Sequence, residues 1–98
     1  MTIEKRAELI DCYDAYRSLL TPKQQIYFEA YYFDDWSITE IALNHAVSRN
    51  AVFDQIKRVS AILEEYEEKL AFIAKRKKIE ELDIPQSIKE KILEIIKE

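Results

Sequence analysis

The feature that most constrains this chain is the absence of glycine: its 98 residues contain none, and only two prolines. Without glycine, backbone positions with positive φ are energetically costly, and the tight two-residue turns of β-hairpins become rare. The glycine-rich loops that hold phosphate groups or dinucleotides are excluded for the same reason. The sequence therefore predicts an all-α fold and argues against most nucleotide-binding enzymes.

Length and composition indicate one small domain over residues 1–98. Apolar residues make up 48% of the chain and charged residues 35%, and this mixture is too apolar for a disordered polypeptide. The single cysteine, Cys12, cannot form an internal disulfide. Because we also find no apolar run of membrane-spanning length and no secretory leader, we expect a cytoplasmic protein without membrane contact.

Five helices are predicted from the spacing of the apolar residues and from the residues that begin and end helices. Pro22 is suited to the first position of a helix, and capping boxes are expected at Thr21, Ser37 and Ser87. The expected helices cover residues 3–20, 22 to about 34, about eight residues after Ser37, 48 to about 79, and a last amphipathic stretch beyond Pro85.

The third and fourth helices have the pattern of a helix-turn-helix. Two helices that cross steeply across a three-residue turn leave no room for a large side chain in the first helix, and apolar side chains form a wedge between them. These small, capping and apolar positions are filled by Ala42, Ala46, Val47, Ser48, Val52 and Ile56. We expect the motif and its support at 20–63 and a helical arm at 64–98.

This geometry would expose the opposite face of the fourth helix, which carries Arg49, Asn50, Phe53, Asp54, Lys57 and Arg58. The opening turn of such a helix reaches base edges in the major groove of DNA, where arginine pairs with guanine and asparagine with adenine. Basic residues further along, and the amides near Ser37, are suited to phosphate. The predicted DNA-binding residues are Ser37, Ser48, Arg49, Asn50, Phe53, Lys57 and Arg58.

Several runs of this sequence resemble known helix-turn-helix proteins. The runs LTP at 20–22, SITEIA at 37–42, VSRNAV at 47–52 and IKR at 56–58 resemble region four of bacterial sigma factors. The runs YYFDDWS at 31–37, SRNAVFD at 48–54 and ILEEYEEKL at 62–70 are similar to the YlxM-like helix-turn-helix proteins of Gram-positive bacteria and mollicutes. This second resemblance covers residues 1–98.

The resemblance to YlxM-like proteins implies a DNA-binding or regulatory role in a gene cluster with the signal recognition particle GTPase, and hence a part in protein targeting. The resemblance to sigma region four implies left-handed turns at Asp35 and Ala46, where those domains commonly have glycine. A non-glycine residue in such a turn costs about 1 kcal/mol, so we expect these turns to be slightly rebuilt. Phe53 and Asp54 depart from the basic or small polar residues that favour a phosphate-rich groove.

Apolar residues continue along the fourth helix with heptad spacing, from Val52 to Ile73. A helix from 48 to 79 would be about 45 Å long, whereas a compact domain of this size has a radius of gyration of about 13 Å. Part of the helix should therefore project. We predict a homodimer interface at Leu63, Tyr66, Leu70 and Ile73, with packing against the last helix or the first helix of the same chain as the alternative.

Two functions of different kinds follow. The first is a homodimeric regulator that binds double-stranded DNA. The alternative is a non-catalytic accessory module of the signal recognition particle, in which Phe53 and Asp54 contact protein or the basic run at 75–78 contacts RNA. The basic run can also be interpreted as the solvent-exposed end of a helix, where lysine and arginine interact favourably with the negative end of the helix dipole. The net charge of −4 predicts modest affinity for DNA from a single copy.

Catalysis and metal binding are not expected. No nucleophile, base and orienting group occur at plausible spacing, and the sequence predicts no cofactor. His45 stands alone, whereas a metal site needs about three or four converging ligands. Cys12 is expected to be a small buried apolar residue, and the aromatic residues between 27 and 36 are expected to pack in the core rather than to stack on bases.

Overall fold

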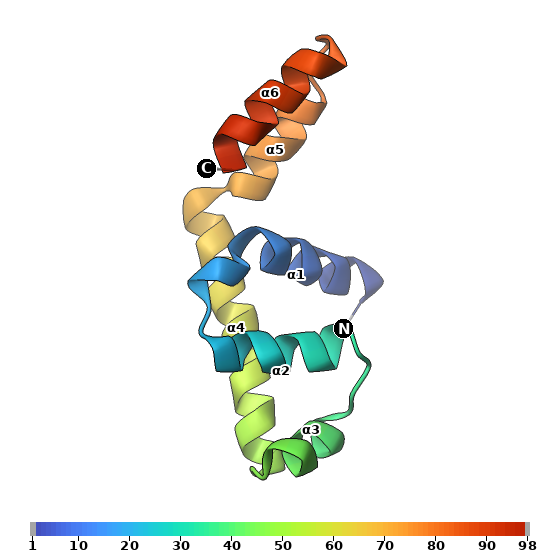
Figure 1. Cartoon of the computed structure of the whole chain (residues 1–98), viewed down its shortest axis with the longest axis vertical. Helices are drawn as coiled ribbons and strands as arrows, with labels where there is room; N and C mark the ends of the chain where they lie inside the picture. The colour runs from blue at the N-terminus through green and yellow to red at the C-terminus, as the bar shows by residue number, and fades with distance from the viewer. Residues whose placement is uncertain (1, 98) are drawn as a thin grey trace.

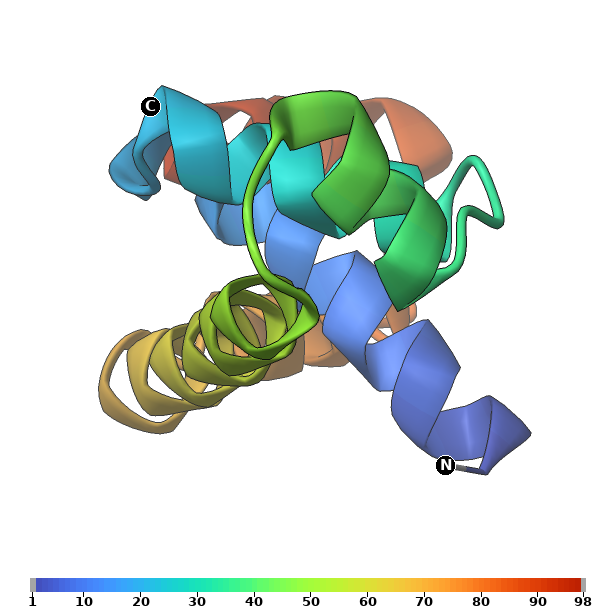
Figure 2. The ribbon, with the colours of Figure 1, turned by 90° about the horizontal axis from the view of Figure 1, so that it is seen from below.

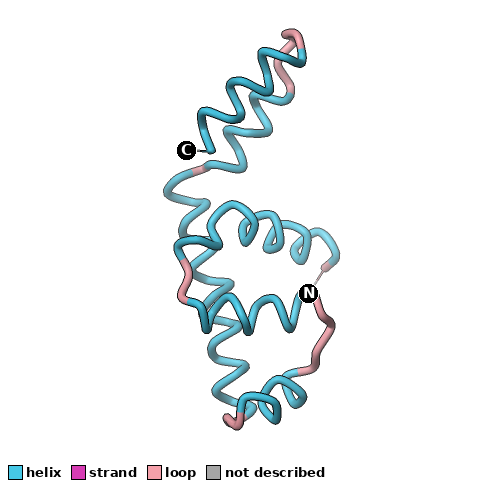
Figure 3. Tube along the Cα trace, in the orientation of Figure 1, coloured by secondary structure: helices cyan, strands magenta, loops and turns pink. Residues whose placement is uncertain are grey.

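The computed structural model describes residues 2–97, and this part of the chain contains helices and no strands (Figures 1 and 3). Its elements are α1 (Ile3–Tyr16), the 3-10 helix η1 (Arg17–Leu19), α2 (Pro22–Tyr32), α3 (Ile38–His45), α4 (Arg49–Leu70), α5 (Phe72–Glu80) and α6 (Gln86–Lys97). The all-α prediction is confirmed. The prediction of five helices is wrong, because residues 2–97 form six α-helices.

Two of the three expected capping boxes are present. The Thr21 hydroxyl accepts from the Gln24 amide at 3.2 Å, and the Gln24 side chain accepts from the Thr21 amide at 2.9 Å. Ser37 and Glu40 form the same reciprocal pair at the start of α3. Ser87 does not cap a helix, because α6 already begins at Gln86, directly after Pro85.

The long fourth helix is shorter than predicted, since α4 ends at Leu70 and α5 begins at Phe72. Ala71 separates them in the left-handed conformation, with φ 51° and ψ 36°. The Glu67 carboxylate accepts from the amides of Ile73 at 3.1 Å and Ala74 at 3.3 Å. A carboxylate at this position satisfies unpaired amides at the start of α5 and stabilises it through the helix dipole.

Tyr16, the last residue of α1, also stabilises the break between α4 and α5. Its hydroxyl donates to the Glu67 carboxylate at 2.6 Å and accepts from the Phe72 amide at 3.1 Å. Burial, followed by the hydrogen bond to Glu67, raises the pKa of Tyr16 to about 12. The hydroxyl therefore stays protonated and able to donate at neutral pH.

The core lies where α1, α2 and α3 pack against α4. The Tyr13 and Phe28 rings stack at 4.3 Å, and Phe28 lies 4.4 Å from the Tyr32 ring. Of the aromatic residues expected in the core, Tyr27, Phe28 and Tyr32 are buried, whereas Phe33 is exposed. The largest fully buried side chains are Leu9, Tyr13, Phe28, Ile41, Val52, Val59 and Leu63. Viewed nearly along α4, the other three helices gather on one side of it (Figure 2).

The predicted heptad seam is covered mainly by α1 of the same chain. Leu63 has no exposed surface, Ile73 is buried, and the Tyr66 ring lies 5.8 Å from that of Tyr16. Leu70 is 49% exposed. Leu63 and Ile73 are already buried within one chain, so they have little surface available for contact with a second chain. The prediction that these two residues lie in a dimer interface is therefore corrected. The last helix packs on α5 instead of on the seam.

The described part of the chain is elongated, measuring 51 × 26 × 22 Å with a radius of gyration of 16.1 Å. A compact chain of this length would have a radius of about 13 Å. The excess comes from the hairpin of α5 and α6, which extends from the end of α4 that lies opposite α3 (Figure 1). Within residues 2–97, no helix combines the length and the apolar character that crossing a bilayer requires.

Candidate nucleic-acid interface

The turn between α3 and α4 consists of residues 46–48. Ala46 adopts φ 53° and ψ 44°, and the Val47 amide donates to the Ala42 carbonyl at 3.0 Å. The Ser48 hydroxyl then caps α4 by accepting from the Ala51 amide at 3.0 Å. The left-handed turn that the resemblance implied at Ala46 is thus formed without glycine, and the same holds for Asp35, at φ 55°.

The wedge between α3 and α4 forms as the side-chain sizes predicted. Ala42, Val52 and Ile56 are buried, and Val47 is half-buried in the turn. Because α3 packs against α4 and these side chains are buried, the rotation of α4 about its own axis is fixed. The predicted burial of Ala42, Val52 and Ile56 is confirmed.

The opposite face of α4 is exposed. It carries Arg49, Asn50, Phe53, Asp54, Lys57 and Arg58, all of them open to solvent. A hollow of about 500 Å³ lies at its start, lined by Ile38, Ser48, Arg49, Asn50 and Phe53. The first turn of α4 has no acidic residue, so no carboxylate there competes with an anion for the positive end of the helix dipole.

The start of α3 is a poorer place for a phosphate than the sequence suggested. The Ser37 hydroxyl accepts from the Glu40 amide at 3.1 Å, and the Glu40 carboxylate accepts from the Ser37 amide at 3.3 Å. A carboxylate held at this helix start repels an anion. Of the two serines predicted to lie at the interface, only Ser48 stands at a helix start free of such a charge.

Lys23 is a basic residue that sequence reasoning missed. It lies in the second position of α2, with its amine 5.6 Å from the centroid of the Tyr27 ring. It lines a hollow of about 210 Å³ beside α4, together with Asp54 and Arg58. No local pattern in the sequence indicates this proximity, because it results from the packing of α2 against α4.

The basic run at 75–78 lies far from this face. It belongs to α5, while Arg49 stands at the opposite end of α4, a helix whose 22 residues span about 33 Å. Lys75, Lys77 and Lys78 are exposed, whereas Arg76 is half-buried and lies 3.8 Å from Glu80. The two groups of cations are thus separate surfaces.

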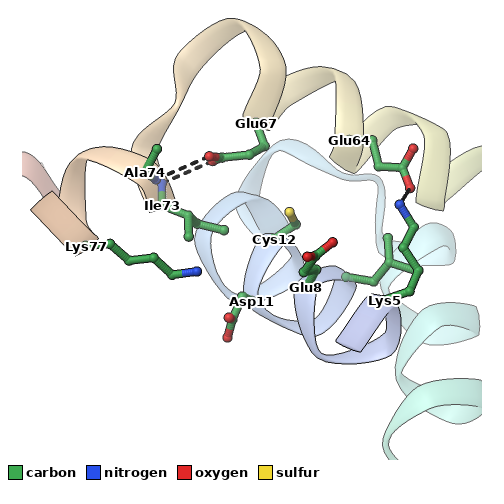
Figure 4. Close-up of a pocket in the computed structure, with 10 residues that line it drawn as sticks. Lys5, Glu8, Asp11, Cys12, Glu64, Glu67, Ile73, Ala74 and Lys77 are labelled. Carbon is green, nitrogen blue, oxygen red and sulfur yellow. Dashed lines mark hydrogen bonds and ion pairs between the residues drawn. The ribbon is translucent and has the colours of Figure 1, made fainter. Parts of the chain in front are cut away.

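A third hollow, of about 320 Å³, lies between α1, α4 and α5, with Cys12 among its lining residues (Figure 4). Burial, followed by the negative charges of Glu67 and Asp11, raises the pKa of the Cys12 thiol to about 11. The thiol is therefore protonated at neutral pH and unsuited to nucleophilic chemistry. Across the described residues, no group of three or more His, Cys, Asp or Glu side chains is arranged to hold a metal ion.

A buried wedge, a tight turn and an exposed face on the second helix are the parts of a helix-turn-helix protein. The family model described as "Putative helix-turn-helix protein, YlxM / p13 like" (UPF0122) matches residues 3–98, so this chain belongs to that family. The description is that of a helix-turn-helix protein and names no reaction. The resemblance to YlxM-like proteins is confirmed.

Relatives in the family share about half of their aligned residues with this chain. A UPF0122 protein of Bacillus pumilus is 51% identical over 82 residues, which cover 84% of this chain and 74% of the relative. The UPF0122 protein YlxM of Bacillus subtilis is 51% identical over 75 residues, covering 76% and 68%. A UPF0122 protein of Halalkalibacterium halodurans is 49% identical over 90 residues, covering 92% and 81%.

Proposed function

We propose that this chain is a DNA-binding regulator, acting on the gene cluster of the signal recognition particle, whose α4 enters the major groove with its first turns. The observation that carries the proposal is the exposed face of α4, which bears Arg49, Asn50, Lys57 and Arg58 and is held by a buried wedge. Arginine and asparagine in the first turn match the base-reading positions of such helices, and the two later cations match phosphate positions.

The charge distribution supports a binding mode that uses more than one copy. The face of α4 offers three cations against one carboxylate, on a chain with a net charge of −4. A single copy can neutralise few phosphates, so its affinity is modest. We propose that two chains act together on successive half-sites, which multiplies these contacts.

Fluorescence anisotropy with a duplex from the promoter region of the chain's own gene cluster tests this function. Plotted against the logarithm of salt concentration, the logarithm of the binding constant should fall with a slope of about −2 for each bound copy, because the two cations assigned to phosphate displace counterions. Arg49→Ala should bind about 5- to 100-fold more weakly, since a base contact is lost.

Lys78→Ala is the matched control, since it removes an exposed cation of the arm. The affinity of this variant for the duplex should stay within about twofold of that of the parent. The substitution changes the net charge of the chain but removes no proposed DNA contact. A slope near zero, or an Arg49→Ala variant that binds as tightly as the parent, would rule out the proposed function.

The exposed amines of Lys75, Lys77 and Lys78 favour a second candidate, an accessory module that contacts the RNA or the protein of the signal recognition particle. Pull-down with the purified GTPase and its RNA separates the two candidates. The second candidate predicts retention of one component, and loss of that retention in a variant with all three lysines changed to alanine. Retention of neither component would remove it.

A further inference from the structure

Phe53 is an aromatic side chain in the middle of a basic face. It is 51% exposed, although its neighbours Val52 and Ile56 are buried. On a helix that turns about 100° per residue, Phe53 lies about 40° from Arg49 and about 40° from Lys57. The ring thus stands between two cations, on the side of α4 that the proposed function directs toward DNA.

Asp54 does not share the surroundings of Phe53. It lies about 100° further around the helix, and it lines the hollow that contains Lys23 and Arg58. Phe53 instead lines the hollow at the start of α4 together with Arg49 and Asn50. The carboxylate of Asp54, which would repel a phosphate, therefore lies on a different side of α4 from the Phe53 ring.

On the side that faces α2, the surface beside the ring is mainly apolar. Phe53 and Ile38 line both the hollow at the start of α4 and another of about 360 Å³, which runs along α4 past Ile56 and Lys57. The far end of this hollow is lined by the ion pair of Lys5 and Glu64, so the rim is cationic only near Phe53. An apolar surface with a cationic rim suits a group that presents a small apolar substituent on a polyanion. The C5-methyl group of thymine, exposed in the major groove of duplex DNA, has this character.

We propose that Phe53 is a specificity determinant that contacts the C5-methyl group of a thymine beside the bases reached by Arg49 and Asn50. This inference rests on the proposed DNA binding and adds a base preference to it. The DNA sites bound by this chain then contain thymine at that step, and part of their affinity comes from its methyl group.

The test compares the promoter duplex with the same duplex in which uracil replaces every thymine, so that the methyl groups are removed and base pairing is kept. The parent chain should bind the uracil duplex about fourfold more weakly for each methyl group that it contacts, as expected for one buried methyl or methylene. Phe53→Ala should bind both duplexes equally. Phe53→Leu keeps an apolar side chain and should retain part of the preference.

Arg49→Ala is the matched control, because it should lower the affinity for both duplexes and leave their ratio unchanged. Circular dichroism checks that the Phe53 variants keep their helices. If the parent binds neither duplex, the proposed function itself fails. If it binds both with equal affinity, or if Phe53→Ala keeps the preference for thymine, DNA binding stands and this inference is overturned, which leaves Phe53 for a protein contact.

Discussion

Three residues carry left-handed backbone that glycine usually provides, namely Asp35, Ala46 and Ala71, with φ of 55°, 53° and 51°. For a residue with a Cβ atom this conformation costs roughly 1–2 kcal/mol. Ala46 and Ala71 directly follow the last residues of α3 and α4, and Asp35 lies in the loop between α2 and α3. Ala46 has a further role, since its conformation sets the angle between α3 and α4.

Ala46→Gly should raise the free energy of unfolding by about 0.5–1 kcal/mol. The left-handed penalty is removed, and the greater flexibility of glycine in the unfolded chain offsets part of the gain. Urea unfolding followed by circular dichroism measures the change. Ala61→Gly, at an exposed position within α4, is the control and should lower the free energy by about 1 kcal/mol. A loss of stability in Ala46→Gly would contradict the account of the turn.

At the scale of elements, the break between α4 and α5 results from contacts between residues that are far apart in the sequence. Tyr16 and Glu67 are separated by 51 positions, and together they bind the three amides of Phe72, Ile73 and Ala74. The hydrogen bonds of Glu67 involve a charged group and are accordingly strong. This cluster holds the arm against the end of α1.

Glu67→Ala should therefore lower the free energy of unfolding by about 1–3 kcal/mol, because the amides at the start of α5 and the Tyr16 hydroxyl lose their acceptor. Amide hydrogen exchange at Ile73 and Ala74 should become faster. The adjacent exposed carboxylate provides the control, since Glu68→Ala removes the same group without these bonds. Equal effects in the two variants would show that the carboxylate of Glu67 does not hold the break.

The contrast between helix starts and this break shows which features the sequence could predict. The capping boxes at Thr21 and Ser37 are local patterns, so they could be found from neighbouring residues. The helix-turn-helix could be found because Ala42 and Val52 satisfy a steric rule with fixed spacing. The break at Ala71 could not, because alanine favours helix most strongly and the heptad spacing continues through it.

At the scale of the whole molecule, the arm leaves apolar side chains without cover. Leu70, Ile88 and Ile95 are exposed, and α6 has no buried residue. The sequence suggested an apolar surface for self-association on the seam of α4, but α1 fills most of that seam. We place the proposed homodimer contact on the arm instead, where these side chains remain open.

Light scattering at micromolar concentration should give a mass near that of two 11.7 kDa chains. Ile95→Lys should shift the mass to one chain, because an isoleucine that is 69% exposed would be replaced by a charge inside the contact. Ile3→Lys introduces the same charge at an 85% exposed isoleucine of α1 and should leave the dimer intact. A single-chain mass for the parent would reject the homodimer.

The central claim is that the exposed face of α4 binds DNA. Nuclear magnetic resonance tests it most directly, through the amide chemical shifts of the labelled chain during titration with the promoter duplex. The account predicts the largest shifts at residues 48–58, with smaller shifts at Lys23 and little change in α6. Shifts confined to α5 and α6, with Arg49 and Asn50 unmoved, would contradict it.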